Sequence, residues 1–519
     1  MTARRIADAD GAASRETVRF SFDGRTVEGR AGEPLAVSLL AAGVSILSRS
    51  FRFHRPRGLM CSTGQCGWCE CEVDGRPGVR SCQVPVRDGL VARGEHAFPS
   101  VGRDLFGWLD LGSRWIAPTF YHHRFLRPRR LRRAYLDVLR AFGGRGRLPM
   151  GGVVARGTAS ARVGRVERSA EPDVLVVGGG RAGLRAAIEA AERGARVTIV
   201  DAAPMVRPDG EIPALRDAAV AAGVELLDGT TAVGWYNGVV TAVSGDTLWT
   251  FRPRAVVAAT GSYEVVPPVR GADRPGVMGA RTVVALVERY GIIPGERALL
   301  VGEEGDLAGV RAALESAGSN IVAAVPTADL RRVHGRRGVR AASFVVDGRE
   351  RRESVDLVVV GDRTTNPDLP SVAGATMAWR DGILHPVTGE SGRSSVPTLS
   401  VVGSAAGRPH QPPHQHPRPH GRTLVCFCED VHADEIRHEV AAGYADPELV
   451  KRRTGALTGP CQGKYCLTAV TCELRAAGAG VVPLPADAPP TTSRPPLTPV
   501  RLGDLVASDL AAREESSGG

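Results

Sequence analysis

The distribution of ten cysteines constrains this chain more than any other feature of its sequence. Five of them lie between Cys61 and Cys82, and the other five lie between Cys426 and Cys472. A disulfide framework is typical of small secreted chains, whereas this chain has 519 residues and begins with no apolar signal segment. Two tight cysteine groups therefore indicate two metal centres, in a protein that we expect to be cytoplasmic.

The first group has the spacing Cys61-x4-Cys66-x2-Cys69-x12-Cys82. Four thiolates are the ligand set of a 2Fe-2S cluster, in which each iron takes two of them. Three of these cysteines fall in one short loop rich in small residues, so backbone N–H groups can approach the sulfurs. A structural zinc site is the alternative, although zinc ribbons usually pair two short knuckles. Cys71 is left over and is expected to be a small buried residue.

The second group consists of the pair Cys426-x-Cys428 and the pair Cys461-x4-Cys466. Between the pairs lie two short helical patterns, DVHADEIRHEVAAG and DPELVKRRTG. Two close pairs joined by a small helical module can hold a second 2Fe-2S cluster, with zinc as the alternative. Cys472 follows in a predicted helix, where we expect it to contribute packing.

A nucleotide-binding fingerprint lies in the middle of the chain, in VLVVGGGRAGLRAAIEAAERGARVTIVD. An apolar strand precedes Gly178-x-Gly180-x-x-Gly183, an alanine-rich helix follows, and Asp201 ends the next strand. The glycines permit a tight turn and the close approach of a pyrophosphate to the helix N-terminus. Asp201 is placed to accept hydrogen bonds from the adenosine ribose, which favours FAD or NAD over NADP. The Thr260–Gly261 turn is typical of the place where flavoprotein chains return beneath the nucleotide.

A second strand–glycine–helix unit, RALLVGEEGDLAGVRAALESAG, begins near Arg297. Its glycines, Gly302, Gly305 and Gly309, are spaced unlike the fingerprint. Two glutamates at 303–304 occupy the place where a phosphate approaches, which is electrostatically poor for a pyrophosphate. We therefore favour a structural remnant of a nucleotide domain over a working NAD site.

The net charge of +10 comes almost entirely from arginine, since Lys451 and Lys464 are the only lysines. No recognised nucleic-acid module accompanies this charge, so we expect no nucleic-acid partner. No stretch approaches the roughly 18 consecutive apolar residues of a membrane span, so we expect none. The histidines of GRPHQPPHQHPRPHG, at 410, 414, 416 and 420, are interpreted as part of a solvated linker rather than as a metal site.

These observations predict an α/β multidomain chain with a β-grasp-type 2Fe-2S domain, a central Rossmann-like core of two dinucleotide-binding domains, and a small helical C-terminal 2Fe-2S domain of the BFD type. The expected segments are the ferredoxin-like domain (15–100), a helical connector (101–165), the first dinucleotide domain (166–270 plus 385–406), the second (271–384), the linker (407–421), the C-terminal cluster domain (422–485) and a tail (486–519).

Five segments together resemble the alpha subunit of heterotetrameric sarcosine oxidase. They are SRSFRFHRPRG (48–58), DRPGVMGARTVVALVERYGIIPGERALLVG (273–302), CEDVHADEI, GPCQGKYC and RPPLTPVRLGDL (494–505). The chain is also similar to the alpha subunits of opine, hydroxyproline and proline dehydrogenases and of hydrogen cyanide synthase. The four N-terminal cysteines lie on a domain similar to the small ferredoxin-like subunit of the opine and hydroxyproline enzymes, fused here to the alpha subunit.

The resemblance implies a division of labour. A separate amino-acid-oxidase-like beta subunit holds FAD and oxidises an amino acid or secondary amine, and an FMN often lies at the alpha–beta interface. The alpha subunit holds FAD, NAD or ATP in its dinucleotide site, together with iron–sulfur centres that move electrons onward. It also implies a cofactor contact at Gly403, although Ser404 stands where flavoproteins usually place an aspartate. The folate-binding half of sarcosine oxidase alpha has no counterpart in these 519 residues.

We therefore expect the electron-transfer alpha subunit of a flavin-dependent amino-acid or secondary-amine dehydrogenase or oxidase complex. No acid/base pair for substrate oxidation is evident, so no catalytic residue is assigned. Neither the substrate nor the electron acceptor follows from the sequence. The alternative is a self-contained NAD(P)H-dependent iron–sulfur flavoprotein reductase, which needs a working second nucleotide site. A third is a non-enzymatic iron-storage partner, which has no use for the N-terminal cluster domain.

Overall fold

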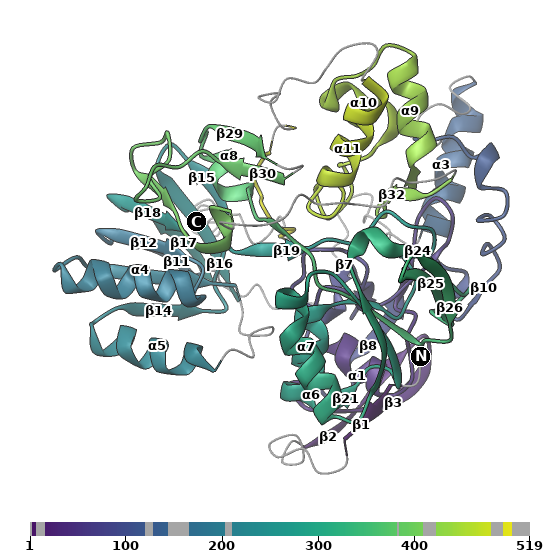
Figure 1. Cartoon of the computed structure of the whole chain (residues 1–519), viewed down its shortest axis with the longest axis horizontal. Coiled ribbons are helices and arrows are strands. Elements are labelled where there is room, and N and C mark those ends of the chain that lie inside the picture. The colour runs from purple at the N-terminus through teal and green to yellow at the C-terminus, as the bar shows by residue number, and fades with distance from the viewer. Residues whose placement is uncertain are drawn as a thin grey trace, which may run out of the picture. The chain divides into compact units, whose positions relative to one another are not determined.

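The computed structural model describes residues 3–6, 16–119, 128–143, 166–202, 210–245, 247–380, 383–407, 422–478, 491 and 493–500. The chain divides into two compact units, whose helices and strands are labelled in Figure 1. The first unit comprises Met1–Leu148, Glu264–Arg363 and Gln415–Leu484, and the second comprises Pro149–Tyr263, Thr364–His414 and Pro485–Gly519. Both cysteine groups therefore belong to the first unit.

The N-terminal part of the first unit is a five-stranded mixed sheet with one helix packed on it. Asp23–Gly24 and Asp74–Gly75 form the two predicted hairpin turns, and all four residues have positive φ. Alternating burial places Val18, Phe20 and Phe22 of one strand in the core. In the order β3-β2-β8-β6-β7, the strands are β3 (Arg25–Arg30), β2 (Thr17–Phe22), β8 (Val91–Gly94), β6 (Glu70–Val73) and β7 (Arg76–Arg80), and the helix is α1 (Leu35–Ala41).

The middle part of the first unit is a four-stranded parallel sheet of the nucleotide-domain type. Its central strands are buried along their whole length, as expected where helices cover a parallel sheet. The sheet order is β20 (Val277–Gly279), β27 (Leu357–Val360), β22 (Arg297–Val301) and β23 (Asn320–Val325), with α6 (Ala280–Tyr290) and α7 (Glu304–Ser316) side by side (Figure 1). An antiparallel sheet of β24 (Leu330–His334), β25 (Ala341–Val346) and β26 (Arg349–Glu353) follows α7 in sequence.

The C-terminal part of the first unit is a small helical module around a short hairpin. Asp446 caps its second helix, because the carboxylate accepts the backbone N–H groups of Glu448 and Leu449 at 2.8 and 3.1 Å. Gly455 ends that helix in the left-handed conformation, with φ 76°. The elements are β32 (Leu424–Cys426), β33 (Val431–His432), α9 (Ala433–Ala441), α10 (Pro447–Thr454) and α11 (Leu467–Gly478).

The second unit is built on a five-stranded parallel sheet. Val176 faces a helical layer with Leu184 of α4, whereas Leu175 and Val177 face an antiparallel sheet with Phe251. The parallel order is β14 (Glu225–Asp228), β13 (Val197–Asp201), β12 (Val174–Val177), β18 (Ala255–Ala258) and β31 (Leu399–Val401), and the helices are α4 (Arg181–Glu192) and α5 (Glu211–Ala221). The second sheet contains β11 (Val166–Ala170), β17 (Thr247–Phe251), β16 (Val239–Ser244) and β15 (Thr231–Tyr236).

One predicted boundary differs from the structure. The sequence predicts that the second nucleotide domain runs to residue 384, but its unit ends at Arg363. The reason is packing, because Leu369 of α8 (Asp368–Val372) and Ala375 lie in the same core as Val177. The remaining elements are β1 (Arg4–Arg5), β4 (Ser48–Arg49), β5 (Pro56–Arg57), η1 (Ser81–Gln83), β9 (Pro99–Ser100), β10 (Arg103–Asp104), η2 (Ser113–Trp115), α3 (Arg129–Gly143), β19 (Ser262–Glu264), β21 (Ile292–Ile293), η4 (Thr327–Asp329), β28 (Arg363–Thr365), β29 (Met377–Arg380), β30 (Ile383–Pro386) and η5 (Gly403–Ala405).

In the described part of the chain, no helix is both long enough and apolar enough to cross a membrane.

A buried set of ion pairs joins the N-terminal and middle parts of the first unit. Arg55 donates two parallel hydrogen bonds to Asp273, from Nε and Nη2, each of 2.7 Å. Arg57 donates to the same carboxylate. Burial opposes ionisation of Asp273, but Arg55, Arg57 and Arg274 hold its pKa well below the usual range. The carboxylate is therefore charged and fully paired.

The same arginine segment reaches the C-terminal module. Arg57 Nη2 donates to Asp430 Oδ1 at 2.7 Å, and the backbone N–H of Phe53 donates to the other oxygen at 3.0 Å. Arg52 forms a two-armed pair with Glu435 and also donates to the Asp430 carbonyl. We call these six charged residues the arginine network: Arg52, Arg55, Arg57, Asp273, Asp430 and Glu435.

Replacing Asp273 with asparagine leaves two buried guanidinium groups without their countercharge. Breaking one partner of a buried pair costs about 3–5 kcal/mol, so we expect a loss of that size in the free energy of unfolding. Urea unfolding followed by circular dichroism measures it. The matched control is Asp228→Asn, which breaks an exposed pair with Arg216 and should cost under about 1 kcal/mol. Equal losses in the two variants would contradict the role of the network.

Glu435 predicts how stability changes in acid. Burial raises the pKa of Glu435, but hydrogen bonds from His432 and Arg52 outweigh it and lower the pKa to about 2 from 4.5. Because the folded pKa lies below the unfolded one, the stabilisation is complete above pH 4.5 and is lost as the pH falls towards 2. At about 1.4 kcal/mol per pKa unit it amounts to roughly 3 kcal/mol. Stability of Glu435→Gln should therefore depend less steeply on pH in this range, and parallel curves for the two proteins would disprove this.

Candidate functional site

The four N-terminal cysteines are brought together in one buried place. Cys61, Cys66 and Cys69 come from the loop before β6, and Cys82 returns from η1. Burial opposes ionisation of Cys61, but hydrogen bonds from Cys66 and Thr63 lower its pKa to about 5. A hydrogen bond between Cys69 and Cys82 lowers the pKa of Cys69 and raises that of Cys82. The predicted ligand set is therefore assembled.

This loop also presents donors that lack protein partners. Ser62 Oγ and Arg80 Nε are buried, and neither has a hydrogen-bond partner among the described residues. Left-handed backbone at Ser62, Gly64 and Gly67 curls the chain around the thiols. Buried donors normally find acceptors, and the sulfurs of an iron–sulfur cluster accept such hydrogen bonds. The residues present thus fit a 2Fe-2S cluster.

The four C-terminal cysteines also meet. Hydrogen bonds from Cys428 and Cys466 lower the pKa of Cys461, and a hydrogen bond to Cys426 raises the pKa of Cys466. Only glycine fits at position 459, because an added Cβ would lie 2.3 Å from Cys428 Cβ. Across the described residues, no three or more His, Cys, Asp or Glu side chains are grouped as ligands of a single metal ion.

The two cysteine sets lie against each other within the first unit. The Cys428 thiol donates to the backbone carbonyl of Cys66 over 3.7 Å. Tyr465, which precedes the ligand Cys466, hydrogen-bonds to the Cys61 thiol. Burial, together with the nearby Cys61 and Cys66 thiols, raises the pKa of the Tyr465 phenol well above its usual range, so it stays protonated. Each set therefore contacts a ligand of the other.

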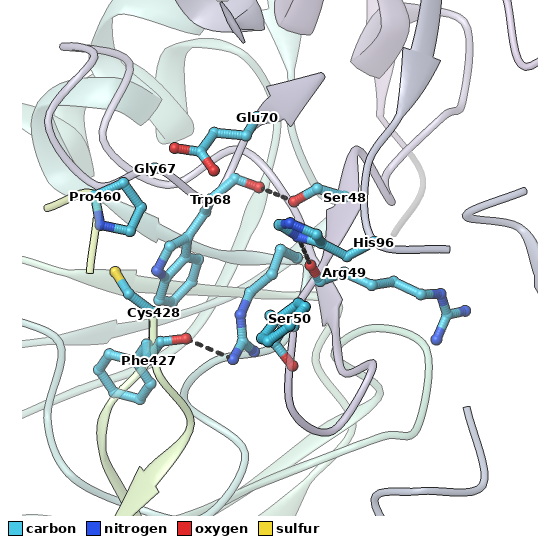
Figure 2. Close-up of a pocket in the computed structure, with 12 residues that line it drawn as sticks. Ser48, Arg49, Ser50, Gly67, Trp68, Glu70, His96, Phe427, Cys428 and Pro460 are labelled. Atoms are coloured by element: carbon cyan, nitrogen blue, oxygen red, sulfur yellow. Dashed lines mark hydrogen bonds between the residues drawn. The ribbon is translucent and has the colours of Figure 1, made fainter. Parts of the chain in front are cut away.

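Aromatic and small residues close this junction. The Trp68 and Phe427 rings meet edge to face with centroids 5.5 Å apart. Gly67 packs so closely on Pro460 that an added Cβ would lie 3.0 Å from it. Figure 2 shows the Cys428 sulfur between Pro460 and Trp68, in a pocket that these residues line. Of the eight predicted ligands, Cys428 is the only one that is not fully buried.

The glycine fingerprint forms the tight loop that the sequence predicts in the second unit. Gly178 has φ 112°, and an added Cβ would lie 2.3 Å from the Ala259 carbonyl oxygen. Gly183 packs on Gly178, where a Cβ would lie 1.9 Å from the carbonyl oxygen. Gly180 caps α4, and Asp201 at the end of β13 accepts the backbone N–H of residue 179. The acid thus lies directly beside the phosphate-binding loop.

The other predicted cofactor contacts occupy the same end of the parallel sheet. Gly403 approaches the start of α4, since an added Cβ would lie 2.6 Å from Ala182 Cβ. The Thr260–Gly261 turn is tied instead to Asn366, whose backbone N–H donates to the Gly261 carbonyl at 3.0 Å. All seven predicted positions therefore gather around the carboxyl ends of the strands, where α/β sheets bind ligands.

The second strand–glycine–helix unit has a different environment. Asp362 Oδ1 accepts the backbone N–H of Glu303 at 3.2 Å, at the start of α7. An added Cβ at Gly302 would lie 2.9 Å from the same carboxylate oxygen. Asp306, in the first turn of α7, pairs with Arg363. Carboxylates therefore stand where a phosphate would approach, which supports the interpretation as a structural remnant.

Several contacts at the cysteine junction do not follow from the sequence. Arg80 and Tyr465 each precede a predicted ligand closely, at two residues and one residue respectively. That proximity is the only sequence signal for them, because contacts between parts so far apart in the chain leave no spacing pattern. The predicted linker histidines at 410, 414, 416 and 420 lie outside the described residues.

A single added methyl group tests the nucleotide loop. Gly183→Ala places a Cβ against the Gly178 carbonyl and distorts the loop, so we expect loss of most of the bound nucleotide. Chromatography of the nucleotides released on denaturation measures it. Gly210→Ala is the control, since this glycine caps α5 at φ −59° with open space around it. Full nucleotide content in Gly183→Ala would show that the loop is not the binding site.

Three family models match the chain. A 2Fe-2S iron-sulfur cluster binding domain covers residues 15–97, an FAD binding domain covers 173–209, and the sarcosine oxidase A3 domain covers 420–509. The first two matches confirm the N-terminal iron–sulfur domain and the FAD-binding core.

Known proteins match over most of the chain. The alpha subunit of sarcosine oxidase from Rhizobium meliloti (strain 1021) is 28% identical over 94% of this chain, which spans 57% of that protein's length. A subunit of opine oxidase from Rhizobium meliloti is 26% identical over 66% of this chain and 88% of its own. The crystal structure of L-proline dehydrogenase from P. horikoshii shares the fold, with a TM-score of 0.70 at 19% identity over 95% of this chain and 98% of its own. The chain therefore belongs to the oxidoreductase family that includes these sarcosine oxidase and opine oxidase subunits.

Proposed function

We propose that this chain is the electron-transfer alpha subunit of a flavin-dependent complex that oxidises amino acids or secondary amines. One observation carries the proposal. Two sets of four cysteines, each able to hold a redox centre, lie against each other in one unit of a chain that also has an FAD-binding domain. A chain built only for storage or assembly has no need for two adjoining centres beside a flavin domain.

The proposed ligands divide into two sets, each for one 2Fe-2S cluster. A cluster of this kind, when bound, supplies one-electron acceptance and donation. The residues of the chain bury the thiols, supply hydrogen-bond donors and exclude water, which together tune the reduction potential. The N-terminal ligands are Cys61, Cys66, Cys69 and Cys82, and the C-terminal ligands are Cys426, Cys428, Cys461 and Cys466.

The dinucleotide site is proposed to hold FAD, with NAD or ATP as the alternative occupants. The loop around Gly178, Gly180 and Gly183 would bind the pyrophosphate, and Asp201 the adenosine ribose. Gly403 lies where the rest of the dinucleotide would pass, and the aspartate usual for a flavin side chain is replaced there by Ser404. An FMN at a subunit interface is a further part of the proposal.

Substrate oxidation is assigned to a partner. The described residues present no acid/base pair beside the dinucleotide loop that would remove a proton from an amine. We propose that the partner is an amino-acid-oxidase-like beta subunit with its own FAD, and that the complex is cytoplasmic. The relatives named as sarcosine and opine oxidase subunits support the donor class, since both names refer to oxidation at a CH–NH bond.

Anoxic affinity purification from the native host, followed by mass spectrometry, tests the division of labour. We expect a near-stoichiometric amino-acid-oxidase-like flavoprotein to co-purify with this chain. If the chain is isolated alone with iron and flavin, and NADH bleaches that flavin in stopped-flow measurements, the alternative of a self-contained reductase replaces the proposal. The carboxylates at the start of α7 argue against that outcome.

Single cysteine variants of the purified complex test the cluster assignment. Cys66→Ser should remove about half of the iron, because each cluster contributes two irons. It should also abolish acceptor reduction while the substrate still reduces the partner's FAD. The matched control is Cys71→Ser, since Cys71 is equally buried but contacts the Leu47 carbonyl rather than the thiol cluster. Loss of substrate-driven FAD reduction in Cys66→Ser would contradict the assignment.

A further inference from the structure

We propose that Arg80 is a positioning residue that fixes the ligand loops of the two cysteine sets against each other, so that the centres they hold are electronically coupled. This inference rests on the proposed function, because it requires a 2Fe-2S cluster in each set. It adds a residue that holds no ligand position and has no counterpart in the motifs of either cysteine group.

Arg80 bridges the two ligand loops directly. Its Nη1 donates to the carbonyl of Gly64, inside the N-terminal loop between Cys61 and Cys66. Its Nη2 donates to the carbonyl of Pro460 at 2.8 Å, immediately before the C-terminal ligand Cys461. One planar group thus binds a carbonyl from each set at the same time.

The chemistry of the guanidinium suits this position. Its donors lie in a rigid plane, so two carbonyls bound by the same group are held at a fixed separation. The side chain is 9% exposed, so water competes little for these bonds. The third donor, Nε, is buried without a partner among the described residues, which leaves it free to donate towards a cluster sulfur.

The contacts around Arg80 show what it holds in place. Pro460 packs on Gly67 with no room for a side chain, and Cys428 donates to the Cys66 carbonyl. Both contacts depend on the Pro460 segment staying against the N-terminal loop. Loss of the Arg80 bridge would also leave the carbonyls of Gly64 and Pro460 without this donor, so the two loops would separate to admit water.

Electron paramagnetic resonance of the dithionite-reduced full chain tests the inference without any activity assay. Two adjacent reduced clusters broaden each other's signals and shorten each other's spin relaxation. We expect this magnetic interaction in the unaltered protein, and a severalfold weaker one in Arg80→Met with both signals and the full iron content retained. Arg93→Met is the matched control, since this arginine is exposed on β8 in the same sheet, and it should leave the interaction unchanged.

Each outcome decides the matter. Two signals without interaction in the unaltered protein would overturn the inference while leaving the proposed function intact. One type of signal with half the iron would overturn both. An unchanged interaction in Arg80→Met would remove the role of Arg80. If that variant loses iron, Arg80→Lys decides, because lysine keeps the charge but cannot bridge both carbonyls, so a full-strength interaction in it would also overturn the role.

Discussion

The arginine network is the interaction on which the rest of the first unit depends. Three parts of this unit lie far apart in the chain, and Arg55, Arg57 and Arg52 connect them through Asp273, Asp430 and Glu435. Each carboxylate is buried or nearly so, and each is paired by at least one guanidinium. The segment 48–58 leads directly into the loop of the N-terminal cysteines, and Asp430 follows Cys428 by two residues. The network therefore sets where the two cysteine sets meet.

Placing the two cysteine sets side by side changes what each can do. An isolated buried centre is insulated by the protein around it, whereas the contact between Cys428 and the Cys66 carbonyl leaves no intervening side chain. Cys428 is also the one predicted ligand with solvent exposure, so this set is the one through which an outside partner has access. The middle part of the unit contributes Asp273 but no working phosphate site, which is consistent with a nucleotide domain retained as a structural frame.

Local features of this protein could be predicted from sequence, and long-range ones could not. The cysteine sets, the glycine loop with Asp201 and the hairpin turns each depend on residues close together in the chain, where spacing reports geometry. The return of the chain at Thr364 depends instead on Leu369 and Ala375 packing into a distant core, so the predicted boundary at 384 differs from the structure. Segment 48–58 carries a family motif, but its pairing with Asp273 and Asp430 has no local signal.

The choice of buried charge over apolar contact at this junction has a physical reason. Apolar packing would stabilise the association as well or better, because desolvation makes buried ion pairs costly. Apolar surfaces, however, slide with little penalty, while a two-armed guanidinium–carboxylate pair is satisfied in one geometry only. Electron exchange between two centres depends steeply on their separation. A junction whose function is to hold a distance therefore gains more from directional bonds, at Asp273 as at Arg80, than from additional burial of apolar area.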